Sequence, residues 1–232
     1  MNNTLVLVHK KPQLGIGKQR LAAQFGTELT LQIAEALLAC AIEDTTMWPG
    51  PVVFSPANEK DCHWARQLAD QLHFPSQVVA QIKGNLGQRL NALDKTLRDQ
   101  GMERLIYIGS DAPSLTEQDY AAARSHLNQN DVALMPAADG GVVLMANRRS
   151  WPDLTGLPWS TDCLGAALTN KCRAEKMSVS ILNENFDIDK PEDFLRLAQW
   201  LKTDRRPARR ALHKLADQIA ASINISLDRI NA

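Results

Sequence analysis

The chain has 232 residues, 44% of them hydrophobic, so it can bury a full core, and one domain with a short appendage is expected rather than two domains. Its 26 basic and 26 acidic residues balance to a formal net charge of +0. Binding to nucleic acid or to a membrane surface requires a basic excess that offsets phosphate charge. The balance therefore argues against both partners.

The cysteines and the hydrophobic runs indicate the compartment. The four cysteines show no CxxC spacing, which argues against a zinc site and a disulfide framework. The N-terminal apolar run is too short for a signal peptide, and no apolar run approaches the roughly 20 residues that span a bilayer. We therefore expect a cytoplasmic protein without a membrane span.

A predicted strand at residues 4–8, TLVLV, leads into a loop that is rich in glycine and positive charge. Gly15 lets backbone N–H groups approach a phosphate closely, and Lys18 and Arg20 supply compensating charge. The loop lacks the spacing of a P-loop and of GxGxxG. It is either a phosphate-binding loop or an ordinary solvated basic loop.

Alternating strands and helices follow. The segment TELTLQIAEALLACAIED has the apolar spacing of an amphipathic helix, and Thr27 is its predicted N-cap. Residues 52–55 and 76–80 are predicted strands, separated by a helix over 58–72. Right-handed crossovers between such units produce a mostly parallel sheet.

The segment QIKGNLGQRL after the third strand is a second candidate ligand-binding loop. Gly87 lies at a turn before a helix, and Gln81 and Arg89 are placed to contact a ligand. The other interpretation is a helix start with ordinary surface side chains.

The segment ERLIYIGSDAPSL predicts a central strand at Leu105–Ile108, buried on both faces and stopped by Pro113. Asp111 follows this strand. Ligands of open α/β sheets bind beyond the carboxyl ends of the strands, so Asp111 is well sited to hold a divalent cation against a phosphate. Alternatively, it forms an Asx turn or caps the following helix, which is predicted over 116–127.

The step Asp139-Gly140-Gly141 lies between two apolar runs. It predicts either a tight hairpin or a place where two glycines leave room for a ligand faced by Asp139. Spacing does not separate the two.

The last two motifs are LPWSTD and DIDKPEDFLRL. Trp159 could anchor the core or stack on a planar or sugar ring, and Ser160 or Thr161 could cap a helix. Pro191, Glu192 and Asp193 are typical of a helix start. Asp189 lies just outside that helix, as Asp111 does for its own strand.

From Thr203 the composition changes to an Arg-rich segment followed by an amphipathic helix. Its apolar positions are Leu212, Leu215, Ile219 and Ile223. We expect residues 203–232 to form a linker and a helix that packs on the main domain or on a second subunit, as a homodimer would. Asp204 or an acidic surface should compensate the arginines.

The stretches PQLGIGKQRL, QIKGNLGQRL, IGSDAPSLT, ADGGVVLM, LPWSTD and DIDKPEDFLRL, in this order, resemble a small bacterial glycosyltransferase-A-like family. That family is a domain of unknown function within the nucleotide-diphospho-sugar transferase superfamily. The resemblance covers about residues 4–201. It implies an α/β fold, a single GT-A-like (Rossmann-like) domain over 1–202 with a mixed, mostly parallel sheet flanked by helices, and a C-terminal helical extension over 203–232.

The resemblance also implies functional residues. Asp111 and Asp189 match the acids that hold a divalent metal, Mg²⁺ or Mn²⁺, against a nucleotide diphosphate, and Lys18 and Arg20 match a Lys-x-Arg that contacts phosphates. Two positions depart from the family: Ala112 replaces a cysteine, and Val142 replaces an aromatic residue. The second departure weakens the case for a stacking contact there.

We therefore expect a metal-dependent transferase that uses a nucleotide-activated donor, a nucleotide sugar, and a small-molecule acceptor. Asp111 would act through the metal and Asp139 as the general base. The nucleotide and phosphate contacts would come from Gly15, Lys18, Arg20, Gln81, Gly87, Arg89, Gly140 and Gly141, and the acceptor contacts from Trp159, Ser160 and Thr161. The alternatives are a nucleotidyltransferase that releases pyrophosphate and a non-catalytic nucleotide-binding protein.

Overall fold

The computed structural model describes the backbone of residues 3–230 and, apart from residue 195 and residues 222–230, their side chains. The chain forms two compact units. The first contains residues 3–11, 44–110 and 115–186, and the second contains residues 12–43, 111–114 and 187–230. The expected boundary after residue 202 stays a prediction, and it falls within the second unit.

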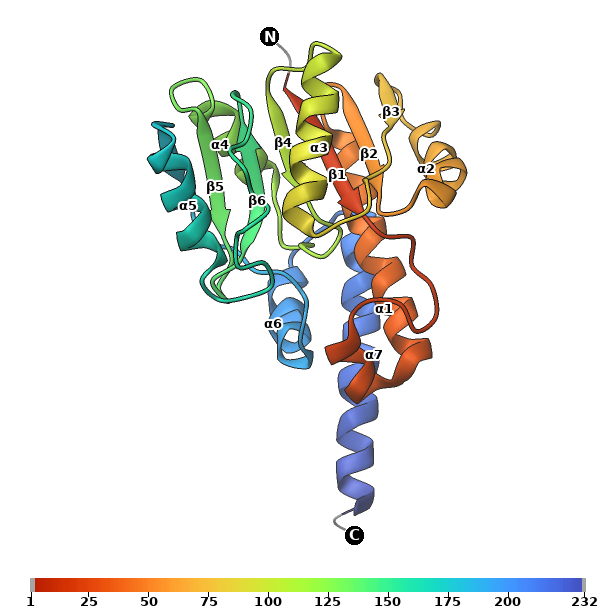
Figure 1. Ribbon diagram of the computed structural model, residues 1–232. Helices are drawn as coiled ribbons and strands as arrows, with labels where there is room; N and C mark the ends of the chain where they lie inside the picture. The colour runs from red at the N-terminus through yellow and green to blue at the C-terminus, as the bar shows by residue number, and fades with distance from the viewer. Residues whose placement is uncertain (1–2, 231–232) are drawn as a thin grey trace. The chain divides into compact units, whose positions relative to one another are not determined.

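The first unit is built on a sheet that has seven strands among the described residues, in the order β3-β2-β1-β4-β6-β5-β7 (Figure 1). β6 pairs antiparallel with β4 and β5, and the other pairings are parallel. The predicted mixed, mostly parallel α/β sheet is thereby confirmed. The strands are β1 (Thr4–His9), β2 (Val52–Pro56), β3 (Ser76–Val78), β4 (Leu105–Ile108), β5 (Val132–Pro136), β6 (Val142–Asn147) and β7 (Val179–Ile181).

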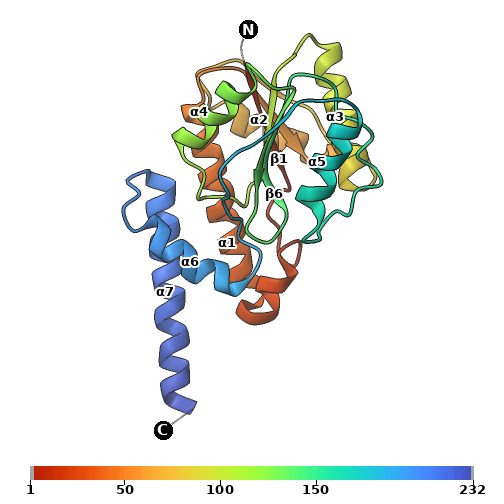
Figure 2. The same cartoon turned by 90° about the vertical axis from the view of Figure 1, so that its left-hand side faces the viewer.

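Helices of the first unit cover both faces of this sheet. Figure 2 shows α3 and α5 on one face and α4 on the other. On the first face, Leu90, Leu93 and Leu97 of α3 join a buried apolar cluster that includes residues of β1, β2, β4 and α5. The elements are the short 3-10 helix η1 (Glu59–Asp61) and the helices α2 (Cys62–Ala69), α3 (Leu86–Asp99), α4 (Glu117–His126) and α5 (Leu164–Ala174).

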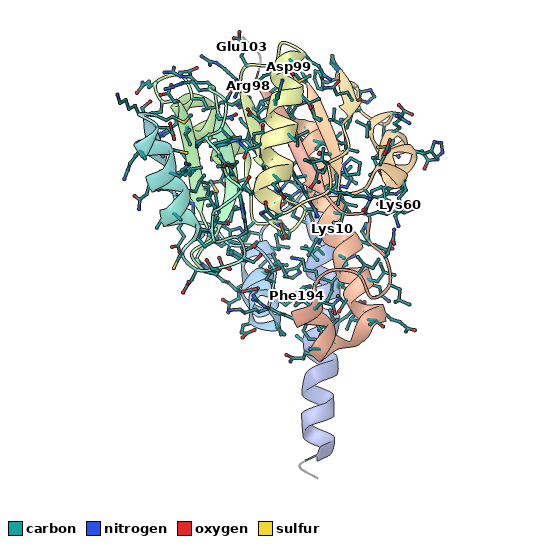
Figure 3. The ribbon with its side chains drawn as sticks, in the orientation of Figure 1. Lys10, Lys60, Arg98, Asp99, Glu103 and Phe194 are labelled. Carbon is teal, nitrogen blue, oxygen red and sulfur yellow. The ribbon has the colours of Figure 1, made fainter. Side chains whose placement is uncertain are left out.

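The central strands are buried because both faces of the sheet are covered. All four residues of β4 are buried, as the continuous apolar run of the sequence predicts. One buried carboxylate, Asp94 of α3, accepts hydrogen bonds from the Tyr107 hydroxyl and the Asn147 amide and pairs with Arg98, which Figure 3 labels. These partners satisfy a charge that would otherwise be costly to bury.

The step Asp139-Gly140-Gly141 forms the turn of a hairpin between β5 and β6. The Gly141 amide donates to Asp139 Oδ1 over 3.0 Å, and the Gly140 amide donates to the Ala137 carbonyl. Gly140 has φ 87°, and a Cβ there would lie 1.9 Å from the Asp162 carbonyl oxygen. The turn therefore requires glycine for its own geometry and packing.

Two predicted helix starts differ from the structure. α5 begins at Leu164 after Cys163, so neither Ser160 nor Thr161 is its N-cap. Helix α1 (Gln19–Met47) begins eight residues before the expected cap Thr27, with a break at Gly26 (φ 76°, ψ 167°). Apolar periodicity located the second part of α1 but carried no signal for the short helical segment that precedes the glycine.

Helix α1 bears on the expected absence of a membrane span. Among the described residues, α1 is the one helix that is long and apolar enough to cross a membrane, although core helices meet the same criteria. Ile33, Leu37 and Cys40 are buried at helical spacing, so one face of α1 packs against protein. We keep the absence of a membrane span as a proposal.

The second unit contains most of α1 together with α6 (Pro191–Leu201) and α7 (Pro207–Ile230). The rings of Phe25 and Phe194 meet edge to face with centroids 6.1 Å apart, and Figure 3 labels Phe194 on α6. This contact ties the first turns of α1 to α6. Both segments adjoin predicted site residues in the sequence, Arg20 and Asp189.

Arg209 of α7 is fully buried. Its guanidinium donates to the carbonyl oxygens of Pro113 and Cys40, and it pairs with Glu43 at 3.1 Å. Arg206 pairs with Asp204, as expected, at 2.6 Å. Arg209 thus links α7 to α1 and to the segment that carries Asp111.

The apolar face of α7 largely follows the prediction. Leu212 and Ile219 are buried and Leu215 is half-buried, while Ala216 is an additional buried position. The side chain of Ile223 lies outside those described. A homodimer through this helix stays a prediction.

Arg209→Ala should lower the free energy of unfolding by about 3–5 kcal/mol, because it removes the buried guanidinium that pairs with Glu43 and donates to two carbonyl oxygens. Arg210→Ala, an exposed neighbour in the same turn, should change it by less than about 0.5 kcal/mol. Urea denaturation of both variants measures the difference. Equal stabilities would show that the buried ion pair contributes nothing net.

Candidate metal and phosphate site

Three acidic residues of the second unit come together at a candidate cation site. Carboxylate oxygens of Asp111, Asp187 and Asp189 lie within 4.8 Å of one another. The Ile188 amide donates to the Asp111 carbonyl oxygen at 2.9 Å, so backbone pairing sets the two segments side by side. The structure therefore brings together Asp111 and Asp189, the two predicted metal ligands.

The start of α6 holds the second segment in place. Asp193 Oδ2 accepts from the backbone amides of Asp189 and Lys190 at 2.9 and 2.6 Å. Asp193 thus acts as an acidic residue of the first helical turn that accepts from free backbone amides, which is the helix-start role predicted for it. The carboxylate of Asp189 is left to face the other acids and Lys18.

Lys18 lies among these carboxylates. Its Nζ is 3.0 Å from Asp111 Oδ2 and 2.8 Å from Asp189 Oδ1, and it also donates to the Ile188 carbonyl oxygen. The side chain is 15% exposed. The predicted phosphate-binding lysine and the predicted metal-binding acids thus form one cluster.

The charges in the cluster perturb its pKa values. Burial by itself lowers the pKa of Lys18, but the carboxylates of Asp111 and Asp189 outweigh it and raise this pKa above its ordinary value. Burial likewise opposes ionisation of Asp189, yet Lys18 and Arg20 hold the pKa of Asp189 below its ordinary range. Lys18 is therefore a cation and Asp189 an anion at neutral pH.

The donor set fits a divalent cation. Mg²⁺ holds its oxygen ligands about 2.1 Å away, so its ligand oxygens are at most about 4.2 Å apart, which is compatible with three carboxylates whose oxygens lie within 4.8 Å of one another. Sets made only of oxygen favour Mg²⁺, Mn²⁺ or Ca²⁺ over softer metals. The residues that would hold such an ion are Asp111, Asp187 and Asp189.

Asp187 was not among the predicted ligands, although the sequence carried a signal for it. Alternate residues of an extended segment point to the same side, so the DID motif presents Asp187 and Asp189 together with Ile188 between them. Ile188 is fully buried, which matches this alternation. Arg20 is exposed but lies close enough to Asp189 to act on its charge.

Apart from Gly15, the other predicted nucleotide contacts lie in the first unit, where several side chains have internal partners. Gln81 is buried and donates to the Ser55 carbonyl oxygen at 2.7 Å, and Arg89 Nε donates to the Gly84 carbonyl oxygen at 2.8 Å. A Cβ on Gly87 would lie 2.1 Å from the Leu154 carbonyl oxygen. Packing therefore accounts for Gly87, and its role in binding stays a prediction.

The predicted acceptor residues form a loop of the same unit. Trp159 packs against the apolar cluster and donates from Nε1 to the Leu154 carbonyl oxygen at 3.0 Å, which favours its role as an anchor. Ser160 and Thr161 are exposed, and Ser160 has φ 64°. Their contacts with an acceptor stay predictions, as do those of Gly140, Gly141 and Asp139 with a nucleotide or acceptor.

Solved structures share this fold. The chain is similar to a protein of Desulfovibrio desulfuricans G20 provisionally assigned as a nucleotide-diphospho-sugar transferase, with a TM-score of 0.80, 21% identity and coverage of 97% of this chain and 98% of that chain. It is also similar to 4-diphosphocytidyl-2C-methyl-D-erythritol synthase from Anaerococcus prevotii DSM 20548 (TM-score 0.54, 10% identity, 86% and 96% coverage). A third is the inositol-1-phosphate CTP transferase from T. maritima (TM-score 0.51, 14% identity, 82% and 91% coverage). At these identities, the similarities confirm the predicted fold.

The search of curated proteins found no significant match. A family model described as an uncharacterized protein conserved in bacteria (DUF2064) matches residues 19–161. The matched segment contains Asp111 and ends before Asp189. Because it spans more than half of the chain, this protein belongs to the bacterial DUF2064 family.

Proposed function

We propose that the protein is a metal-dependent transferase that uses a nucleotide sugar as donor. The observation that carries this proposal is the convergence of Asp111, Asp187 and Asp189 with Lys18. Three carboxylates suit a divalent cation, and a cation paired with a diphosphate is the usual way to bind a nucleotide-activated donor. The fold shared with a nucleotide-diphospho-sugar transferase and with nucleotidyltransferases supports the same class.

Each residue of the site has a role in this proposal. Asp111, Asp187 and Asp189 would hold Mg²⁺ or Mn²⁺, which when bound supplies charge stabilisation for the leaving nucleoside diphosphate. Arg20 would donate to phosphate oxygens in the bidentate geometry of a guanidinium. Gly15, with φ 74° and open space around its α-carbon, leaves backbone N–H groups of the loop accessible to a phosphate.

The acceptor needs a general base, for which Asp139 remains our proposal. Its carboxylate is exposed, and its Oδ1 accepts a hydrogen bond from the amide of Gly141. The remaining contacts that we propose for the nucleotide are those of Gln81, Gly87, Arg89, Gly140 and Gly141. Those for the acceptor are Trp159, Ser160 and Thr161.

A nucleotidyltransferase is the second candidate, and the two cations near Asp189 favour it. Lys18 contacts Asp189 directly and Arg20 acts electrostatically on Asp189, so two cations lie beside the candidate metal site, where they could contact the phosphates of a nucleoside triphosphate. In that reaction, an acceptor phosphate oxygen attacks the α-phosphorus and pyrophosphate leaves. An assay for pyrophosphate release with candidate acceptors separates the two reactions.

The first experiment is a thermal-shift panel of nucleotides and nucleotide sugars, with and without Mn²⁺, since a ligand that binds the folded chain raises its melting temperature. Stabilisation by a nucleotide sugar only when Mn²⁺ is present would support the proposal. Stabilisation without any turnover would instead favour a non-catalytic nucleotide-binding protein. We also propose that the protein is cytoplasmic.

Asp111→Asn should lower turnover on the order of 100-fold while the protein stays folded, because the amide keeps the shape of the side chain but removes one negative charge from the cation site. Asp70→Asn, an exposed control, should retain full activity. Steady-state kinetics with circular dichroism measures both. Wild-type activity of Asp111→Asn would rule out its role as a metal ligand.

Arg20→Ala should weaken nucleotide binding by roughly 1.5–3 kcal/mol, the usual contribution of a charge-assisted hydrogen bond. Arg66→Ala removes the same charge at an exposed position of α2 and should leave the affinity unchanged. Isothermal titration with the nucleotide that the panel selects makes the comparison. If both variants bind as the wild type does, the loop is only a solvated basic turn.

A further inference from the structure

Lys18 contacts carboxylates that would hold a metal ion. Its Nζ contacts Asp111 Oδ2 at 3.0 Å and Asp189 Oδ1 at 2.8 Å, from positions 93 and 171 residues away in the sequence. These are two of the three carboxylates that together fit a divalent cation. Lys18 therefore pairs directly with two of the candidate metal ligands.

An ammonium and a divalent cation cannot share these oxygens. The metal would lie about 2.1 Å from each carboxylate oxygen, which places it within contact distance of an ammonium that is 2.8–3.0 Å from the same atoms. Like charges at such a separation repel strongly in a partly buried site. Metal binding thus requires Lys18 to leave at least one of the two carboxylates.

The residues before Lys18 in the sequence are exposed or have open space around them, so they leave room for Lys18 to move. Leu14 and Ile16 are 59% and 54% exposed, and a Cβ at Gly15 or Gly17 would meet no atom within 4 Å. Lys18 itself has φ 47°, a left-handed conformation that is uncommon outside glycine. The ion pairs of Lys18 therefore anchor a loop whose apolar side chains at Leu14 and Ile16 are exposed.

We propose that Lys18 is an internal counter-ion that pairs with the metal-binding carboxylates when no metal is bound and moves onto the phosphate groups when the metal and nucleotide bind. This inference rests on the metal site of the proposed function. Its consequence is that metal and nucleotide bind cooperatively, because the nucleotide removes the competitor of the metal. A further consequence is that loss of this positive charge strengthens metal binding when no nucleotide is present.

The test is a titration of Mn²⁺ without nucleotide, measured by calorimetry or by electron paramagnetic resonance of free Mn²⁺. Lys18→Met, which keeps most of the length of the side chain but not its charge, should bind Mn²⁺ about tenfold more tightly than the wild type does, equivalent to roughly 1.4 kcal/mol. Lys18→Arg keeps the charge and should not gain affinity. Lys60→Met, at an exposed position labelled in Figure 3, should bind as the wild type does.

A second measurement uses the wild-type chain, so it does not depend on how the variants fold. Acetylation by an N-hydroxysuccinimide ester, followed by mass spectrometry, reports the reactivity of each lysine. Lys18 should react several-fold faster when Mn²⁺ is added, because displacement from the carboxylates exposes its amine. Lys60 should react at the same rate in both conditions.

The outcomes separate this inference from the proposed function. Equal or weaker Mn²⁺ binding by Lys18→Met, or unchanged acetylation of Lys18 in a wild type that binds Mn²⁺, overturns the role of Lys18 and leaves the metal site standing. If neither protein binds Mn²⁺, the metal-dependent function and the inference fail together.

Discussion

The ion pairs of Lys18 with Asp111 and Asp189 are the interaction on which the candidate site depends. Three carboxylates within 4.8 Å of one another repel, and this arrangement persists only if a cation lies among them. The ammonium of Lys18 supplies that charge at 2.8 and 3.0 Å. The contacts of Lys18 thus join the loop before α1 to the segment after β4 and to the segment before α6.

A second cation has a comparable role in the same unit. Arg209 is fully buried, donates to the Pro113 carbonyl oxygen and pairs with Glu43. It therefore joins α7 both to α1 and to the segment that begins at Asp111. A buried guanidinium is stable only when its donors are used, which makes its partners interdependent. The arginine-rich C-terminal segment therefore contributes a structural contact to the unit that contains the site.

The sheet could be predicted from the sequence because its signals are local. The apolar run of β4, the helical spacing of Leu90, Leu93 and Leu97, and the double glycine of the β5–β6 turn each reflect the conformation of a few adjacent residues. The start of α5 was predicted wrongly because the prediction relied on a local signal, a capping side chain. Side-chain capping is one of several ways to begin a helix, and Cys163 begins α5 without it.

The sequence by itself determined the α/β pattern and singled out Asp111, Asp189, Lys18 and Arg20 as charged residues beside strand ends or glycines. Only the tertiary structure decided that Lys18 pairs with both acids, that Asp187 joins them and that Arg209 is buried. Strand and helix periodicity arises from neighbours in the chain, whereas these pairs are separated by up to 171 residues. Whether a charged side chain is solvated, paired or available to a ligand depends on which distant segment folds against it. Local sequence patterns do not contain this information.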